Sequence, residues 1–478
     1  MSETTKNTVP FGQKLAFGFG MLANQMFPAA MGVFLVVLVQ DLGFSPLAWG
    51  LIFFAPRLFD AITDPIMGFI SDNTRSRWGR RRQYVFVGGL IMGISYIAMW
   101  QLHRDNSISY NFIYFLSMSL VFYLGLTIFS VPFVAMGYEM SSDFHERTNI
   151  MAVAQFIGQW AWVIAPWFWV ILYDPDWFPS ADAGVRQLSV WVAIPCSILA
   201  IVPAIFIKSK STEHRTDFKP INLKSIGSSL GDIAKSTREA FSIPQFRKLA
   251  FATFLVFNSF NVIAAFTFFI IVHHLFGGAA EKAGVWPALH GCVGALITTF
   301  LVIPIVAAMA KKIGKKKAFL ISQAISMIGY ILFWFLFVPG KPYLFLFALP
   351  FHSFGIGSLF TLMMSMTADV CDLDELNSGK RREGIIGAVY WWMVKFGGAF
   401  AGLLGGLIMT FVGFDPGGEV TESAITGMRL AYTILPIAGV LGAILIMRNY
   451  DLSEVRAAEV RQQLADKKAT GGTTLQNQ

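Results

Sequence analysis

The chain has 478 residues, of which 55% are hydrophobic and only 14% are charged, and its formal net charge is +8. Ordinary soluble domains are about one-quarter charged, so this composition excludes a soluble globular fold. The positive balance does not indicate nucleic-acid binding either, because the basic residues gather in short loops between apolar runs.

Apolar runs of membrane-spanning length recur from end to end, and they predict an all-α polytopic membrane protein with twelve transmembrane helices. A polar middle divides them into two sets of six. We therefore expect an N-terminal six-helix bundle (1–207), a linker (208–247), a C-terminal six-helix bundle (248–447) and a tail (448–478). In chain order the predicted helices are 12–40, 46–71, 84–103, 109–137, 148–173, 187–208, 248–276, 284–310, 317–338, 342–369, 385–413 and 424–447.

Loop charges predict the orientation of these helices. Basic clusters follow the second, eighth and tenth predicted helices, at 75–82, 311–317 and 380–382, whereas the alternate loops hold only scattered basic residues. By the positive-inside rule, both termini, the linker and the tail are cytoplasmic, in a bacterial inner membrane. We also expect a surface helix near 226–241 in the linker and a tail that is disordered in part.

The second predicted helix carries charges where lipid would be expected. Arg57, Asp60 and Asp64 follow the i, i+3, i+7 spacing of one helix face. A charge at the bilayer centre costs roughly 2.5–3.5 kcal/mol on insertion scales, so this face must contact protein or a wet cavity. Two acids one turn apart repel each other, so one holds a proton or the two share a cation. The alternative is a structural pair in which Arg57 neutralises Asp60.

The two halves of the chain resemble each other. The loop Trp78-Gly-Arg-Arg-Arg82 has a counterpart in Ile313-Gly-Lys-Lys-Lys317, about half the chain later. A second pair of acidic and basic turns, after the fourth and tenth predicted helices, has nearly the same offset. This pattern is typical of parallel six-helix repeats, which hold their substrate between the halves near the midplane of the membrane.

Two motifs carry a resemblance to known proteins. Residues 68–81, Gly-Phe-Ile-Ser-Asp-Asn-Thr-Arg-Ser-Arg-Trp-Gly-Arg-Arg, resemble the loop signature of the major facilitator superfamily. More specifically, Arg57-Leu-Phe-Asp60-Ala-Ile-Thr-Asp64-Pro65, followed by 74–79, resembles the glycoside-pentoside-hexuronide:cation symporter family. The resemblance implies the fold of that superfamily, with twelve transmembrane helices in two six-helix halves, and transport of a sugar together with a cation.

The resemblance also implies an ion site. Asp60 and Asp64 match the two acids that bind the coupling ion, Thr127 matches a nearby hydroxyl, and Thr63 stands between the acids where the family has asparagine. The coupling ion is Na+ or H+, and no other cofactor is expected. Three widely spaced cysteines, Cys196, Cys292 and Cys371, indicate neither a disulfide framework nor a metal site.

The resemblance also implies a substrate site, but this sequence departs from the family pattern at three of its positions. Gln25, Ser130 and Gln155 stand where a well-studied member has two aspartates and an arginine, so the galactoside site of that member is not carried over. Lys395 matches a lysine that faces the central cavity, and it also needs an acidic partner because it lies about ten residues inside a predicted helix. The predicted substrate-binding residues are Gln25, Arg57, Ser130, Gln155, Phe360, Tyr390, Trp391 and Lys395.

Further residues are assigned to a gate and to the membrane interface. Asp72 with the arginines that follow it resembles a cytoplasmic charge network that latches one conformation, and Asp369, Asp372 and Asp374 with 380–382 form its counterpart. The predicted gate residues are Asp72, Arg75, Arg77, Arg80, Arg81 and Asp369. Four tryptophans near the outer end of the fifth predicted helix are typical of an interfacial belt: Trp160, Trp162, Trp167 and Trp169.

These observations favour a secondary active transporter, a monomer that moves a sugar, glycoside or hexuronide by alternating access with Na+ or H+. An anionic sugar acid and a neutral glycoside both remain open. The alternatives are a lipid or other small-molecule carrier of the same superfamily and a non-transporting membrane sensor. We expect no enzyme, because no nucleophile or metal cluster is visible within the predicted helices.

Overall fold

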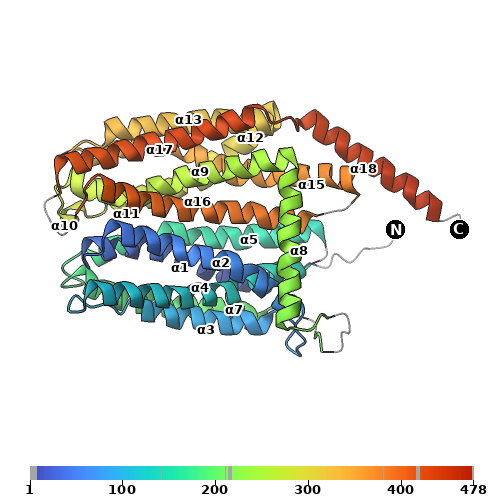
Figure 1. Cartoon of the computed structure of the whole chain (residues 1–478), viewed down its shortest axis with the longest axis horizontal. Coiled ribbons are helices and arrows are strands. Elements are labelled where there is room, and N and C mark those ends of the chain that lie inside the picture. Colours follow the sequence, from blue (N-terminus) through green and yellow to red (C-terminus); the bar gives the residue numbers. More distant parts are fainter. Residues whose placement is uncertain are drawn as a thin grey trace. The chain divides into compact units, whose positions relative to one another are not determined.

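A computed structural model gives the fold of residues 8–141, 143–209, 211–213, 218–379, 382–415 and 420–475. In this part of the chain the regular structure is helical (Figure 1). The helices group into two compact units, chiefly Met1–Gly231 for the first, and chiefly Asp232–Gly278, Val293–Phe414 and Val420–Gln478 for the second.

The first unit holds the helices of the N-terminal half. Helix α1 packs against α5 and α7, α3 packs against α4 and α7, and α2 packs against α4. Gly88 permits the close approach of α3 to α4, because a Cβ atom there would lie 2.4 Å from the backbone N of Phe129. The helices are α1 (Phe11–Gln40), α2 (Pro46–Asp72), α3 (Arg82–Met99), α4 (Ile108–Glu139), α5 (Phe144–Ile164), the 3₁₀ turn η1 (Ala165–Trp167), α6 (Phe168–Leu172) and α7 (Ala181–Phe206).

The later part of the chain contains helices interrupted by irregular turns. Within the second unit, α9 packs against α16 and α17, and α13 packs against α14 and α17. Three π-helical turns, η2, η3 and η5, interrupt the predicted seventh, eighth and tenth helices; such turns are frequent at functional sites. The elements are α9 (Pro244–Phe269), η2 (Ile270–Leu275), α10 (Ala280–Ala283), α11 (Trp286–Leu296), η3 (Ile297–Val302), α12 (Ile303–Ile313), α13 (Lys315–Leu336), η4 (Pro342–Ala348), α14 (Leu349–Ser358), η5 (Leu359–Met363), α15 (Met364–Ser378), α16 (Glu383–Phe411) and α17 (Glu422–Arg448).

Each of the twelve predicted membrane helices coincides with a helical segment. In the described part of the chain, ten segments are long and apolar enough to cross a membrane. The other two are α2, which carries the charges predicted to need polar surroundings, and α3, which has only 18 residues and begins with Arg82. The all-α polytopic fold is therefore confirmed.

The linker and the tail both contain a helix. Helix α8 (Leu223–Ser242) confirms the helix expected in the linker. The expectation of a partly disordered tail is wrong for 454–475, where the chain forms α18 (Glu454–Leu475). Three apolar side chains at i, i+3 and i+7 explain the difference, since they are buried in the core of the second unit: Ala457, Val460 and Leu464.

Candidate functional site

The acids of the second predicted helix meet a hydroxyl from another helix. Asp60 and Asp64 lie on α2, and Thr127 lies on α4. The Thr127 hydroxyl is 2.6 Å from Oδ1 of Asp60 and 2.9 Å from Oδ1 of Asp64. A hydroxyl has one proton and can donate to only one of these carboxylates at a time. A proton on one carboxylate, or a cation that both oxygens share with the hydroxyl oxygen, would relieve the repulsion between the two acids.

Local sequence explains the position of these groups. Asp60 and Asp64 are one turn apart and so lie on the same face of α2. Pro65 has no N–H to donate to the carbonyl of Ala61, one turn earlier, which leaves a helix carbonyl without its usual partner beside the acids. Thr63 lies 3.3 Å from Thr127, oxygen to oxygen, and also bonds the carbonyl of Asp60. Oxygen atoms of carboxylate, hydroxyl and carbonyl groups thus gather around this turn.

Arg57 supplies the positive charge of this cluster. Its guanidinium lies within electrostatic reach of the hydroxyl of Tyr123 and of the carboxylate of Asp60. This contact fits the structural pairing of Arg57 with Asp60, and Asp64 adds a second negative charge to the cluster. With both acids ionised, the three charged groups sum to one negative charge. One proton or one monovalent cation would neutralise them, which a site inside the membrane favours.

Two predicted substrate residues also come together in the first unit. Nε2 of Gln25 on α1 is 3.4 Å from Oε1 of Gln155 on α5. The indole N–H of Trp162 donates to Oε1 of Gln25 over 3.0 Å. Sequence reasoning assigned Trp162 to the interfacial belt and missed this contact. Trp162 follows Gln155 by seven residues, which places both on one face of α5, and this spacing could have indicated the contact.

The remaining predicted substrate residues fall in several places. Ser130 lies on α4 of the first unit. In the second unit, Phe360 in η5 packs edge-on against Phe257, with ring centroids 6.3 Å apart. On α16, Lys395 lies one turn beyond Trp391, which is 45% exposed, whereas Tyr390 is only 1% exposed and belongs to the apolar core.

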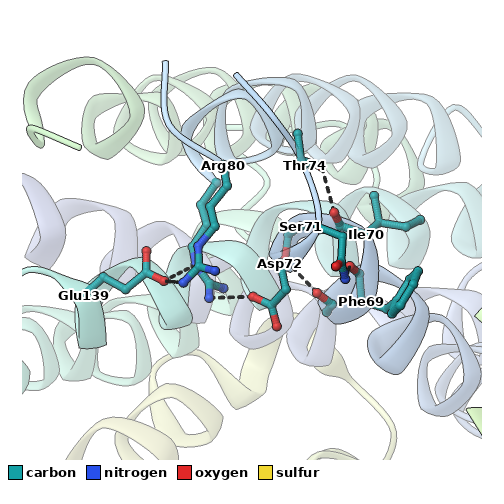
Figure 2. A network of polar contacts seen from close by, with 10 residues as sticks. Phe69, Ile70, Ser71, Asp72, Thr74, Arg80 and Glu139 are labelled. Carbon is teal, nitrogen blue, oxygen red and sulfur yellow. Dashed lines mark hydrogen bonds and ion pairs between the residues drawn. The ribbon is translucent and has the colours of Figure 1, made fainter. Parts of the chain in front are cut away.

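The predicted gate is an ion-pair network at the end of α2. Nη2 of Arg81 lies 2.7 Å from Oδ1 of Asp72, and Nε of Arg81 lies 3.0 Å from Oε1 of Glu139 at the end of α4. Arg80 also pairs with Glu139. Figure 2 shows Glu139 and Asp72 on opposite sides of the arginine side chains. The network ties the end of α2 to the end of α4, with Glu139 as the partner that the sequence did not indicate.

Arg75 and Arg77, also predicted for the gate, contact the linker. The Arg75 guanidinium lies over the ring of Phe218, 5.5 Å from its centroid. Nε of Arg77 lies 3.1 Å from Glu213, but the Arg77 side chain is 87% exposed. These two arginines therefore connect the α2–α3 loop to Glu213 and Phe218, whereas Arg80 and Arg81 connect α2 to α4.

The second unit has its own ionic cluster. Asp369 on α15 lies 2.6 Å from Nζ of Lys315 and 3.1 Å from Nη1 of Arg461 on α18. Asp374 pairs with Arg382 over 2.6 Å, as predicted for this latch. Of the predicted basic cluster, Lys380 and 381 lie outside the described residues.

The chain is similar to known membrane transporters. The model of a family described as MFS/sugar transport protein matches residues 16–454. The chain is 24% identical to the glucuronide carrier protein homolog of Escherichia coli (strain K12), with 95% of each chain covered. It is 22% identical to the lactose permease of Lactobacillus helveticus, over 95% of this chain and 72% of the permease. Among solved structures, a D-xylose-proton symporter is similar with a TM-score of 0.62 and 15% identity, covering 92% of this chain and 97% of the symporter.

Proposed function

The chain belongs to the MFS/sugar transport protein family, and we propose that this sugar symporter holds its coupling cation at Asp60, Asp64 and Thr127. It is a multi-pass membrane protein and a transporter, not an enzyme. The names of its relatives, which include a glucuronide carrier homolog and a lactose permease, favour a sugar or glycoside over a lipid and a transporter over a sensor.

One observation carries the proposal: a single hydroxyl lies within hydrogen-bond distance of two carboxylates. Asp60 is only 4% exposed, Thr127 only 1%, and Asp64 is partly buried, so bulk water screens the repulsion between the acids only weakly. A proton or Na+ bound between Asp60 and Asp64 would relieve this repulsion. Loss of that ion would restore the repulsion and favour a different arrangement of α2 and α4, which is how binding of an ion can drive a conformational cycle.

In this proposal, the ion pairs at the ends of the helices stabilise one conformation of the transporter. Arg81 joins α2 to α4 at their cytoplasmic ends, and Asp369 joins α15 to α13 and α18. We place both termini and the linker in the cytoplasm, on the basis of loop charges. The ion pairs then stabilise one arrangement of each unit and must change when the transporter changes state.

The test is uptake of labelled neutral glycosides and uronates into proteoliposomes, with Na+ and H+ gradients imposed separately. Asp60→Asn and Asp64→Asn keep the shape of each side chain and remove its charge. We expect both to abolish gradient-driven accumulation. Asp105→Asn, in the loop after α3, is the matched control and should transport normally. Accumulation that persists in both variants would refute the ion site.

A further inference from the structure

A polar group on α1 and α5 lies apart from the acids of α2. It consists of Gln25, Gln155 and Trp162, joined by the hydrogen bonds from Trp162 to Gln25 and from Gln25 to Gln155. We call these three residues the amide–indole group. The proposed ion site uses none of them, and the belt assignment of Trp162 does not explain why its N–H is directed at an amide.

The fold builds this group from one face of α5. Positions 155, 158 and 162 follow the i, i+3, i+7 spacing of a single helix face. Position 158 is glycine, and a Cβ atom there would lie 2.7 Å from Nε2 of Gln25. Glycine therefore makes room for the Gln25 side chain to lie across α5, between Gln155 and Trp162.

The exposure of the group indicates that it faces water. Gln155 is exposed, and Trp162 is 45% exposed. A carboxamide inside a membrane helix faces protein or a wet cavity, because contact with lipid would leave its donors and acceptors without partners. Trp160 is similarly exposed, at 43%, but lies about 200° away around the helix. Trp160 therefore points to the opposite side of α5 and suits the interfacial belt.

The chemistry of the group fits a sugar ring without charge. A glutamine amide has both donors and acceptors, as a sugar hydroxyl does, whereas a carboxylate only accepts. The aromatic face of an indole packs against apolar C–H groups, which one side of a pyranose ring presents. The positive charge of Arg57, on α2, interacts with Tyr123 and Asp60. We propose that Trp162 is a substrate-contacting residue whose indole, with Gln25 and Gln155, binds a neutral sugar ring.

This inference rests on the proposed function, and its test separates the two. The probes are methyl β-D-glucopyranoside, methyl β-D-xylopyranoside and the methyl glucuronide that differs from the glucoside only by its carboxylate. Uptake into proteoliposomes is measured for the wild type, Trp162→Leu, Trp162→Phe and the matched controls Trp160→Leu and Trp160→Phe. The concentration of cation that gives half-maximal uptake is measured in parallel.

We expect Trp162→Leu to raise KM for a neutral glycoside about tenfold, because it removes an aromatic contact and a hydrogen-bond donor. Trp162→Phe keeps an aromatic face and should raise KM only about threefold to fivefold, the effect of one lost hydrogen bond. The maximal velocity and the cation concentration that gives half-maximal uptake should stay within about twofold of the wild-type values, because only sugar binding is weakened. Both Trp160 variants should behave as the wild type.

Three results would overturn the inference. If Trp162 and Trp160 variants have the same KM, Trp162 does not touch the sugar, while symport itself stands. If only the glucuronide is carried, the ring bound is charged, and symport again stands. If no probe accumulates under either gradient, the proposed function and this inference fail together. If Trp162→Leu does not insert into the membrane, the KM values of Trp162→Phe and Trp160→Phe are compared instead, and equal values would overturn the inference.

Discussion

The bridge between Asp60 and Asp64 depends on the hydroxyl of Thr127, which makes Thr127→Val a sharp perturbation. Valine has nearly the same shape, and Thr127 is 1% exposed, so the packing of α2 against α4 is retained while the hydroxyl is lost. A hydrogen bond to a charged group contributes about 1.5–3 kcal/mol. The expected change in ion binding is therefore about tenfold to a hundredfold.

The direction of the change depends on the ion. If Na+ is the coupling ion, the hydroxyl oxygen is one of its ligands, and Thr127→Val raises the Na+ concentration needed for half-maximal uptake. If the ion is H+, the hydroxyl stabilises the ionised carboxylates, so its loss lets uptake saturate at a lower proton concentration. The assay is sugar uptake at graded Na+ concentrations and graded pH. The direction in which the half-maximal ion concentration changes identifies the coupling ion.

Two further variants make this experiment decisive. Thr127→Ser keeps the hydroxyl and should stay within about twofold of the wild type, since one lost methyl group does not alter the bridge. Ser119→Ala removes another buried hydroxyl of α4, one that donates to the carbonyl of Leu116, and should leave ion dependence unchanged. Equal ion dependence in Thr127→Val and the wild type would refute the bridging role.

Three more predictions concern helix packing, the ion pairs of Arg81 and the pH dependence of stability. Gly88→Ala places a Cβ atom 2.4 Å from the Phe129 backbone and should lower the melting temperature or block insertion, whereas Gly32→Ala, with open space around it, should not. Arg81→Gln should destabilise the protein in detergent by about 2 kcal/mol, because it breaks two partly buried ion pairs. The highly exposed Arg77 is the matched control, and equal melting temperatures for Arg81→Gln and Arg77→Gln would contradict the network. Burial raises the pKa of Asp41, at the end of α1, from 3.8 to about 6, so the native state binds this proton more tightly than the unfolded state. Stability should then fall by up to about 3 kcal/mol as pH rises from 4 to 6, and Asp41→Asn should flatten the melting temperature over that range.

The grouping of the charged residues on α2 was largely predictable from the sequence. Charged residues within an apolar run must face protein or a wet cavity, and the helical period puts Arg57, Asp60 and Asp64 on one face. The partners from other helices were harder to identify. Tyr123 contacts Arg57 and Glu139 contacts Arg81, but each lies more than fifty residues away, and no local pattern selects it.

Two features of the structure were missed in the sequence, for different physical reasons. Trp162 lies where an interfacial tryptophan is expected, and its helix face and its hydrogen bond to Gln25 distinguish it from Trp160. The tail lacks a long apolar run, which suggested disorder, yet a helix needs only a narrow stripe to dock. Ala457, Val460 and Leu464 form that stripe and were visible in the sequence.

The ionic clusters around Arg81 and Asp369 distribute their charges in opposite ways. In the first unit a base stands between two acids, since Arg81 binds both Asp72 and Glu139. In the second unit an acid stands between two bases, since Asp369 binds both Lys315 and Arg461. Each central group is about one-tenth exposed, so salt screens it less than its exposed partners. Because Asp369 bonds the start of α13 and also α18, one carboxylate links the tail to the membrane helices, and whatever displaces that carboxylate loosens both contacts together.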